Sequence, residues 1–278
     1  MAPNFWEILS STMTKYLHGY QEEEQRRLYE QAGFLEGLIY PWIDLNRNKN
    51  LLELGSGVGG QTEILLKLYP NLSITCVEIE ASQLAQAKKN LQAFQNRNIE
   101  FIHQDATKLQ LEQKFDSAFI CWVLEHTSDP QKVLEGVSAH LESNGIIYIT
   151  EVFNSSFHFF PKLPGLRDYY QAYNAYQVKN GGNPDIGLQL GNLLHQAGFE
   201  NIQVKPGGFL LDQSQPERFK LMTEYWKKLM LSSASEMVAS GLIENHLVKE
   251  MESDLDKISN DPNGVFFYQF IQAKAIKP

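Results

Sequence analysis

The chain has 278 residues, of which 43% are hydrophobic and 21% charged, and this is enough to bury the core of one large domain. Its 24 basic and 33 acidic side chains give a net charge of −9, which opposes the counterion release on which nucleic-acid binding depends. We therefore expect no nucleic-acid partner. Cys76 and Cys121 each lie in an apolar strand pattern, so neither a disulfide framework nor a metal site is expected.

No apolar run approaches the roughly 20 residues that a membrane-spanning helix needs. The first residues also lack the basic start of a signal peptide. We therefore expect no membrane span and a cytoplasmic location.

Residues 1–48 have the pattern of a helical cap. Leu28, Ala32 and Leu35 fall on one helical face, and Pro41 marks the end of the pattern. We expect residues 49–278 to form the catalytic domain.

A glycine turn follows the first predicted strand, residues 51–54. Gly55, Gly57 and Gly59 allow a sharp turn, positive φ and close approach of a ligand. The spacing fits the dinucleotide pattern as well as the S-adenosylmethionine pattern, in which Glu53 precedes the loop. S-adenosylmethionine has no phosphate and carries a sulfonium and an ammonium, so a carboxylate beside the loop favours it over a dinucleotide.

Acidic residues end the next two predicted strands. Residues 73–79 form an apolar strand pattern that reaches Glu78, about 20 residues beyond the glycine turn, where a ribose-binding acid is expected. Residues 99–104 form another, followed by Asp105, whose carboxylate can accept a hydrogen bond from an adenine amine. The order of the two acids favours a nucleoside site at one edge of the sheet.

Strands and helices alternate through the rest of the chain, which predicts a parallel sheet covered by helices. Further strands are expected over 116–124, 146–153, 202–204 and 265–275, and helices over 61–69, 81–95, 130–141 and 188–197.

Two insertions interrupt this alternation. The first, 154–186, is an aromatic lid that suits an apolar or aromatic substrate, although the helical spacing of its tyrosines equally fits packing onto the core. The second, 212–263, is a helical cap with one apolar face, which favours a solvated cap or the contact of a homodimer. That face carries Phe219, Met222, Trp226 and Met230.

The glycine loop, the two acids and the stretch 121–126 resemble the class I S-adenosylmethionine-dependent methyltransferases. Val-Leu-Glu-His at 123–126, followed by Asp129 and Pro130, is similar to the small-molecule methyltransferases of the ubiquinone- and menaquinone-biosynthesis type. The resemblance implies an α/β fold with a Rossmann-like, doubly wound seven-stranded sheet. Strands one to five are expected to be parallel and the last antiparallel.

The resemblance also implies a cofactor site for S-adenosyl-L-methionine. The expected binding residues are Glu53, Gly55, Ser56, Gly57, Gly59, Glu78, Ile79, Asp105, Ala106, Cys121 and Trp122. Glu78 is expected at the ribose, and Asp105 and Ala106 at the adenine. Tyr16, Tyr20 and Arg27 are expected to form a lid over the cofactor's carboxylate.

Methyl transfer is an in-line displacement, so the enzyme mainly positions the reactants and excludes water. A general base is needed only for a hydroxyl, a carbon acid or a protonated amine, and His126 has a suitable ordinary pKa. His126 also fits a purely structural role, and Glu125 and His18 are weaker candidates for the base. The Asn/Asp-Pro-Pro-Tyr tetrad of base amino-methyltransferases is absent after the fourth strand, which further disfavours nucleic acid.

The sequence therefore predicts methyl transfer to oxygen, nitrogen or carbon of a small apolar or aromatic metabolite. Two alternatives remain open. The glycine pattern also fits an NAD(P)-dependent oxidoreductase, and the large helical additions fit a non-catalytic cofactor-binding partner subunit.

Overall fold

The computed structural model describes residues 18–278 and is built around one seven-stranded sheet. The strand order is β3-β2-β1-β4-β5-β7-β6, with β7 antiparallel to both of its neighbours and the others parallel. This order confirms the predicted fold class. The strands are β1 (Asn50–Leu54), β2 (Ser73–Glu78), β3 (Ile99–His103), β4 (Phe115–Cys121), β5 (Leu141–Phe160), β6 (Glu200–Asp212) and β7 (Val265–Ile276).

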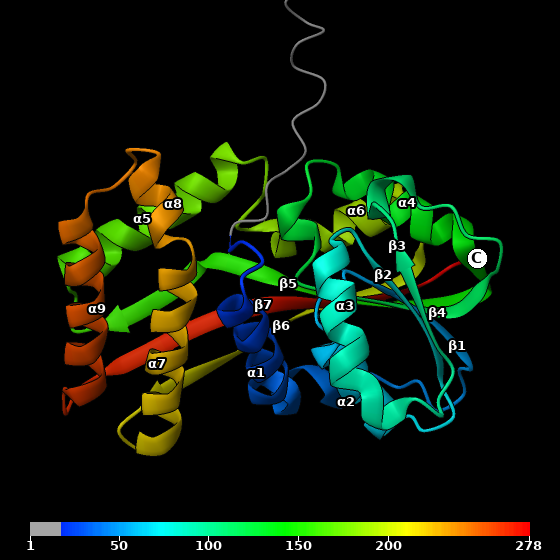
Figure 1. Cartoon of the computed structure of the whole chain (residues 1–278), viewed down its shortest axis with the longest axis horizontal. Helices are drawn as coiled ribbons and strands as arrows, with labels where there is room; N and C mark the ends of the chain where they lie inside the picture. The colour runs from blue at the N-terminus through cyan, green and yellow to red at the C-terminus, as the bar shows by residue number, and fades with distance from the viewer. Residues whose placement is uncertain (1–17) are drawn as a thin grey trace, which may run out of the picture.

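Helices cover both faces of the sheet (Figure 1). The α-helices are α1 (Glu22–Ile39), α2 (Gly60–Leu68), α3 (Ala81–Asn90), α4 (Pro130–His140), α5 (Pro164–Lys179), α6 (Leu190–Gln196), α7 (Pro216–Ser232), α8 (Ala234–Ala239) and α9 (Asn245–Asn260). Short 3-10 helices are η1 (Tyr40–Trp42), η2 (Leu91–Phe94), η3 (Ala106–Lys108), η4 (Leu124–His126) and η5 (Ile186–Gln189). None of the helices within residues 18–278 is long and apolar enough to cross a membrane.

The alternation of side chains along β1 sorts them between two cores. Leu51 packs in the core that includes α1 and α2, whereas Leu52 and Leu54 pack in the core that includes α4 and α6. Both faces of the strand are therefore buried, as the run of apolar residues in a central parallel strand predicts.

Strands β5, β6 and β7 extend beyond the shorter strands and carry α5, α7, α8 and α9 at their far end (Figure 1). The strands predicted over 146–153 and 202–204 were too short, because polar and strand-breaking residues interrupt the apolar pattern in the extensions of β5 and β6. Residues 154–156 interrupt the apolar pattern of β5, where its pairing with β7 shifts register. Pro206 lies in β6, an edge strand, where a missing N–H is tolerated.

The fourth strand ends at Cys121, three residues earlier than predicted. Trp122 has φ 56°, a left-handed conformation that breaks the extended backbone, and Leu124–His126 then form η4. His126 therefore lies in a turn beside the sheet edge.

The apolar face of the second insertion packs inside the chain. Phe219, Met222, Trp226 and Met230 are all buried, with at most 4% of each residue exposed. This stripe stabilises the cap against the extended strands, so it does not form the outward-facing contact surface considered from the sequence.

Candidate active site

A cavity of about 910 Å³ opens at the carboxyl ends of β1, β2 and β4. Its wall includes most of the residues predicted for the site: Tyr20, Arg27, Gly55, Ser56, Gly57, Glu78, Ile79, Asp105, Ala106, Cys121, Trp122 and His126. Tyr16 lies outside the described residues. The wall continues without interruption into aromatic residues of α5, α7, β6 and β7, so one cavity joins the predicted cofactor residues to the two insertions.

The glycine loop fits closely against the turn that follows β4. Gly55 has φ +64°, and a Cβ there would lie 2.4 Å from Cγ2 of Val123, so a side chain cannot be placed without a shift. Gly57 has φ +52°, and a Cβ there would meet nothing within 4 Å among the described residues. This open space, on the cavity wall, is the cradle that a nucleoside ligand needs.

Glu78 ends β2 and braces the glycine loop. Its Oε2 accepts a hydrogen bond from the Gly57 N–H at 2.9 Å, and its Oε1 accepts one from the Glu80 N–H at 3.0 Å. Burial raises the pKa of Glu78, and the backbone amides partly offset that rise. The carboxylate retains lone pairs toward the cavity that can accept from ribose hydroxyls.

Asp105 begins the turn of η3. Its Oδ1 accepts from the N–H and the hydroxyl of Thr107, at 2.9 and 2.7 Å, and Lys108 Nζ lies 3.8 Å from its Oδ2. The side chain is therefore oriented on the cavity wall, where Oδ2 can accept from an adenine amine.

We expect Asp105→Ala to weaken S-adenosylhomocysteine binding by roughly 1–3 kcal/mol, because a hydrogen-bond acceptor for the adenine is lost. Isothermal titration calorimetry measures the change, and Asp105→Asn, which can keep an Oδ1 acceptor for Thr107, separates adenine binding from the turn. Unchanged affinity in both variants would remove Asp105 from the adenine site.

Two of the predicted cofactor residues, Glu53 and Gly59, do not line the cavity. Alternation along β1 points Glu53 to the side of α2, where Thr62 Oγ1 donates to its Oε2 at 2.7 Å. Burial raises the pKa of Glu53 to about 7. Gly59 precedes α2 with φ +80°, and a Cβ there would lie 2.9 Å from Leu91 Cδ1. Both residues shape the loop from within the core.

Arg27 and Tyr20 approach the cavity from the N-terminal side. The Arg27 guanidinium donates to both carboxylate oxygens of Glu24, at 2.7 and 2.6 Å, and to the Tyr225 hydroxyl at 3.2 Å. Burial, followed by the charges of Glu78 and Glu80, raises the pKa of Tyr20 to about 12. Tyr20 is therefore a neutral hydroxyl near Glu78, the acid that the sequence predicts at the ribose.

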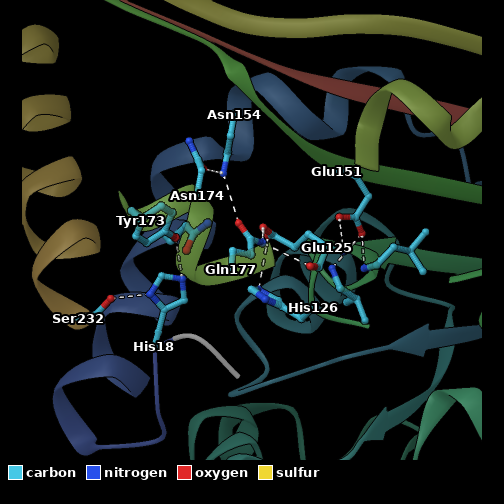
Figure 2. Close-up of polar contacts among 12 residues, drawn as sticks. His18, Glu125, His126, Glu151, Asn154, Tyr173, Asn174, Gln177 and Ser232 are labelled. Atoms are coloured by element: carbon cyan, nitrogen blue, oxygen red, sulfur yellow. Dashed lines mark hydrogen bonds and ion pairs between the residues drawn. The ribbon is translucent and has the colours of Figure 1, made fainter. Parts of the chain in front are cut away.

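His126 and Glu125 lie side by side on the cavity wall (Figure 2). His126 Nε2 is 3.5 Å from Glu125 Oε1, while Gln177 Nε2 donates to Glu125 Oε2 at 2.8 Å. On β5, Asn154 donates to Asn174 at 2.9 Å, so polar contacts extend from the turn to this strand. An acid and an imidazole therefore lie together on the cavity wall.

His18 lies next to His126 on the cavity wall, with 6.1 Å between the ring centroids (Figure 2). Its Nε2 lies 3.2 Å from the Tyr173 hydroxyl, and its Nδ1 contacts Ser232 Oγ. Burial, followed by the charges of Arg27 and His126, holds the pKa of His18 well below its ordinary value. His18 is therefore a neutral ring at neutral pH.

Glu151 supports the site from behind and was missed in the sequence. It is fully buried on β5 and accepts from three consecutive amides, those of Val123 at 2.9 Å, Leu124 at 2.8 Å and Glu125 at 3.3 Å. Burial, followed by the charge of Glu125, raises its pKa to about 8. An acid inside an otherwise apolar strand pattern was the signal that could have identified it.

Residues 52–147 match a family model described as "Methyltransferase domain". A malonyl-[acyl-carrier protein] O-methyltransferase of Bacillus anthracis is 31% identical over 102 residues, 37% of this chain and 37% of that enzyme. A demethylmenaquinone methyltransferase of Chlamydia pneumoniae is 30% identical over 109 residues, 39% of this chain and 46% of that enzyme. The chain thus spans less than half the length of these curated relatives.

Among solved structures, phosphoethanolamine N-methyltransferase 2 of Haemonchus contortus, in complex with S-adenosyl-L-methionine, shares the fold with a TM-score of 0.57. It is 18% identical, and the alignment covers 90% of this chain and 52% of that one. The match over residues 52–147 and the shared fold support the resemblance to the class I S-adenosylmethionine-dependent methyltransferases that was stated from the sequence.

Proposed function

We propose that the chain transfers a methyl group from S-adenosyl-L-methionine to a small, apolar or aromatic metabolite. The observation that carries this proposal is the single cavity in which Gly57, Glu78 and Asp105 share one space with the aromatic side chains of the insertions. A nucleoside beside the three residues leaves the aromatic end for the acceptor. The chain's net charge of −9 supports a small molecule over nucleic acid.

The residues present fit this cofactor. The open space at Gly57 accepts a nucleoside, Glu78 offers acceptors to ribose hydroxyls, and Asp105 offers one to the adenine amine. When bound, the cofactor supplies an electrophilic methyl group on a sulfonium. The protein contributes orientation and exclusion of water, since the cavity wall is formed largely by buried side chains.

His126 is proposed to remove a proton from an acceptor that carries one. It lies on the cavity wall, and Glu125, whose Oε1 is 3.5 Å from His126 Nε2, stabilises the imidazolium that forms. Glu151 holds the turn that carries both side chains.

We expect His126→Ala to leave S-adenosylhomocysteine affinity nearly unchanged and to slow turnover by about 100-fold, because general-base catalysis typically contributes 10²–10⁴. Single-turnover rates measured from pH 5 to 9 check this. A rate and pH profile identical to those of the unmodified protein would assign His126 a structural role.

The proposed function is tested with the purified chain, labelled S-adenosyl-L-methionine and a metabolite extract. Transfer of label to an extract component, together with binding of S-adenosylhomocysteine, is the expected result. Tight NAD(H) binding without a response to S-adenosylhomocysteine would instead support the oxidoreductase alternative. Cofactor binding with no transfer to any acceptor would support the partner-subunit alternative.

A further inference from the structure

The acceptor end of the cavity is walled by aromatic side chains. They are Tyr170, Tyr173, Phe209, Tyr225, Trp226, Tyr268 and Phe270. The Trp226 and Tyr268 rings meet at 60° with centroids 4.9 Å apart, so the wall presents both ring edges and ring faces. Such surfaces bind apolar rings, and their faces also attract cations.

The lysines and arginine on the cavity wall within residues 18–278 already have carboxylate partners. Arg27 pairs with Glu24 at 2.6 Å. At the other end of the cavity, Lys132 pairs with Asp129 at 2.9 Å, and Lys108 lies 3.8 Å from Asp105. An anionic acceptor would therefore have to separate an existing ion pair to reach one of these cations.

His18 does not supply a positive charge either. Its burial among Tyr173, Ser232 and α1, together with the nearby Arg27 and His126, favours the neutral ring. The N-terminal side of the acceptor compartment is therefore polar but uncharged at this residue.

Glu125 provides the negative charge of this compartment. The residue is 7% exposed, lines the cavity, and is held by the neutral amide of Gln177 as well as by His126. Burial, followed by the charge of Glu125, raises the pKa of Tyr268 well above its ordinary value. The Tyr268 hydroxyl donates to Asn154 Oδ1 at 3.0 Å, and Asn154 Nδ2 donates to Gln177 Oε1 at 3.5 Å. Hydrogen bonds therefore link the Glu125 carboxylate through Gln177 to the aromatic wall.

We propose that the methyl acceptor is an amine on an aromatic or apolar skeleton, whose ammonium form is held between the Glu125 carboxylate and the aromatic wall. The inference rests on the proposed methyltransferase function and narrows its acceptor from oxygen, nitrogen or carbon to nitrogen. A carboxylate or phosphate at the same place would be repelled by Glu125.

These residues can accept the proton that the acceptor ammonium has to lose before methyl transfer. The ammonium loses one proton to the Glu125 carboxylate, or through it to His126, and becomes a neutral amine. The nitrogen lone pair then forms a bond to the methyl carbon while the carbon–sulfur bond breaks and its electron pair stays on sulfur. The products are an N-methylammonium and S-adenosylhomocysteine.

Three probes of similar size and different charge test the inference: 2-phenylethylamine, 2-phenylethanol and 3-phenylpropanoate. Each is titrated by calorimetry into the full chain saturated with S-adenosylhomocysteine. We expect the amine to bind at least tenfold more tightly than the alcohol and the carboxylate to bind most weakly. Glu125→Gln should reduce the affinity for the amine about tenfold and leave the affinity for the alcohol unchanged, while the exposed control Glu112→Gln changes neither.

Failure of the amine to bind more tightly than both other probes would overturn the inference, as would an equal effect of Glu125→Gln on amine and alcohol. The comparison of the three probes on the unmodified chain does not depend on how the variant folds. The preceding titration with S-adenosylhomocysteine tests the proposed function separately, since its failure would contradict cofactor binding without any reference to the acceptor.

Discussion

Replacing Glu78 with alanine is expected to weaken S-adenosylhomocysteine binding by about 100-fold, or roughly 3 kcal/mol. Two ribose hydroxyls would lose a charged acceptor, and each hydrogen bond to a charged group contributes roughly 1.5–3 kcal/mol. The same change leaves the N–H groups of Gly57 and Glu80 without their acceptor, so the cradle also becomes less ordered. Calorimetric dissociation constants measure the combined effect.

Two variants separate these contributions. Glu78→Gln keeps one acceptor oxygen and removes the charge, so its affinity should lie between those of the alanine variant and the unmodified protein. The control Glu112→Gln replaces an exposed acid elsewhere in the chain. This variant should bind S-adenosylhomocysteine as tightly as the unmodified protein does. An alanine variant whose dissociation constant stayed within threefold of the original would exclude Glu78 from ribose binding.

Replacing Glu151 with alanine is expected to reduce the free energy of unfolding by about 3 kcal/mol or more. Three consecutive amides of the turn after β4 would lose their shared acceptor, and one buried unsatisfied group costs roughly 1–3 kcal/mol. Urea denaturation measures the loss. Glu142→Gln, an exposed acid on the same strand, should leave the free energy of unfolding nearly unchanged.

Glu151→Gln should also change how stability depends on pH. Burial raises the pKa of Glu151 from 4.5 to about 8, so the folded protein holds a proton that the unfolded chain releases between these values. Stability from this group is greatest below about pH 4.5 and falls as pH rises toward 8. Measured by urea at pH 6 and pH 9, the unmodified protein should lose stability relative to Glu151→Gln. A constant difference between the two proteins would show that Glu151 does not titrate in this range.

The sequence could indicate that the residues proposed to bind the cofactor lie together, because they follow local motifs. Three glycines within five residues, followed by Glu78 and Asp105 at successive strand ends, define positions that the parallel sheet brings to one edge. The pleat of each strand also decides to which face of the sheet a side chain points. Glu53 therefore lies under α2, a position that depends on the pleat of β1 and that the glycine pattern alone could not indicate.

The acceptor half depends on contacts between distant segments. Gln177 reaches Glu125 across 52 positions of sequence, and His18 reaches Tyr173 across 155. No local spacing encodes such pairs, so the sequence could identify an aromatic insertion but not which tyrosines line the cavity. Tyr169 packs into the core with its hydroxyl on the Met230 carbonyl, whereas Tyr170 and Tyr173 face the cavity.

Because β5, β6 and β7 are longer than the other strands, the sheet has two regions, one with all seven strands and one formed by the extensions of these three. The short strands carry the residues proposed to bind the nucleoside. The extensions of β5 and β7 pack against α5 and α7 through aromatic contacts, such as Phe157 and Trp226, whose ring centroids are 4.9 Å apart. Substitutions in the extended region can consequently change the shape of the acceptor end of the cavity, while the glycine loop keeps its geometry. A directed-evolution library confined to the cavity-lining residues of α5 and α7 would therefore vary the proposed acceptor compartment and leave the glycine loop unchanged.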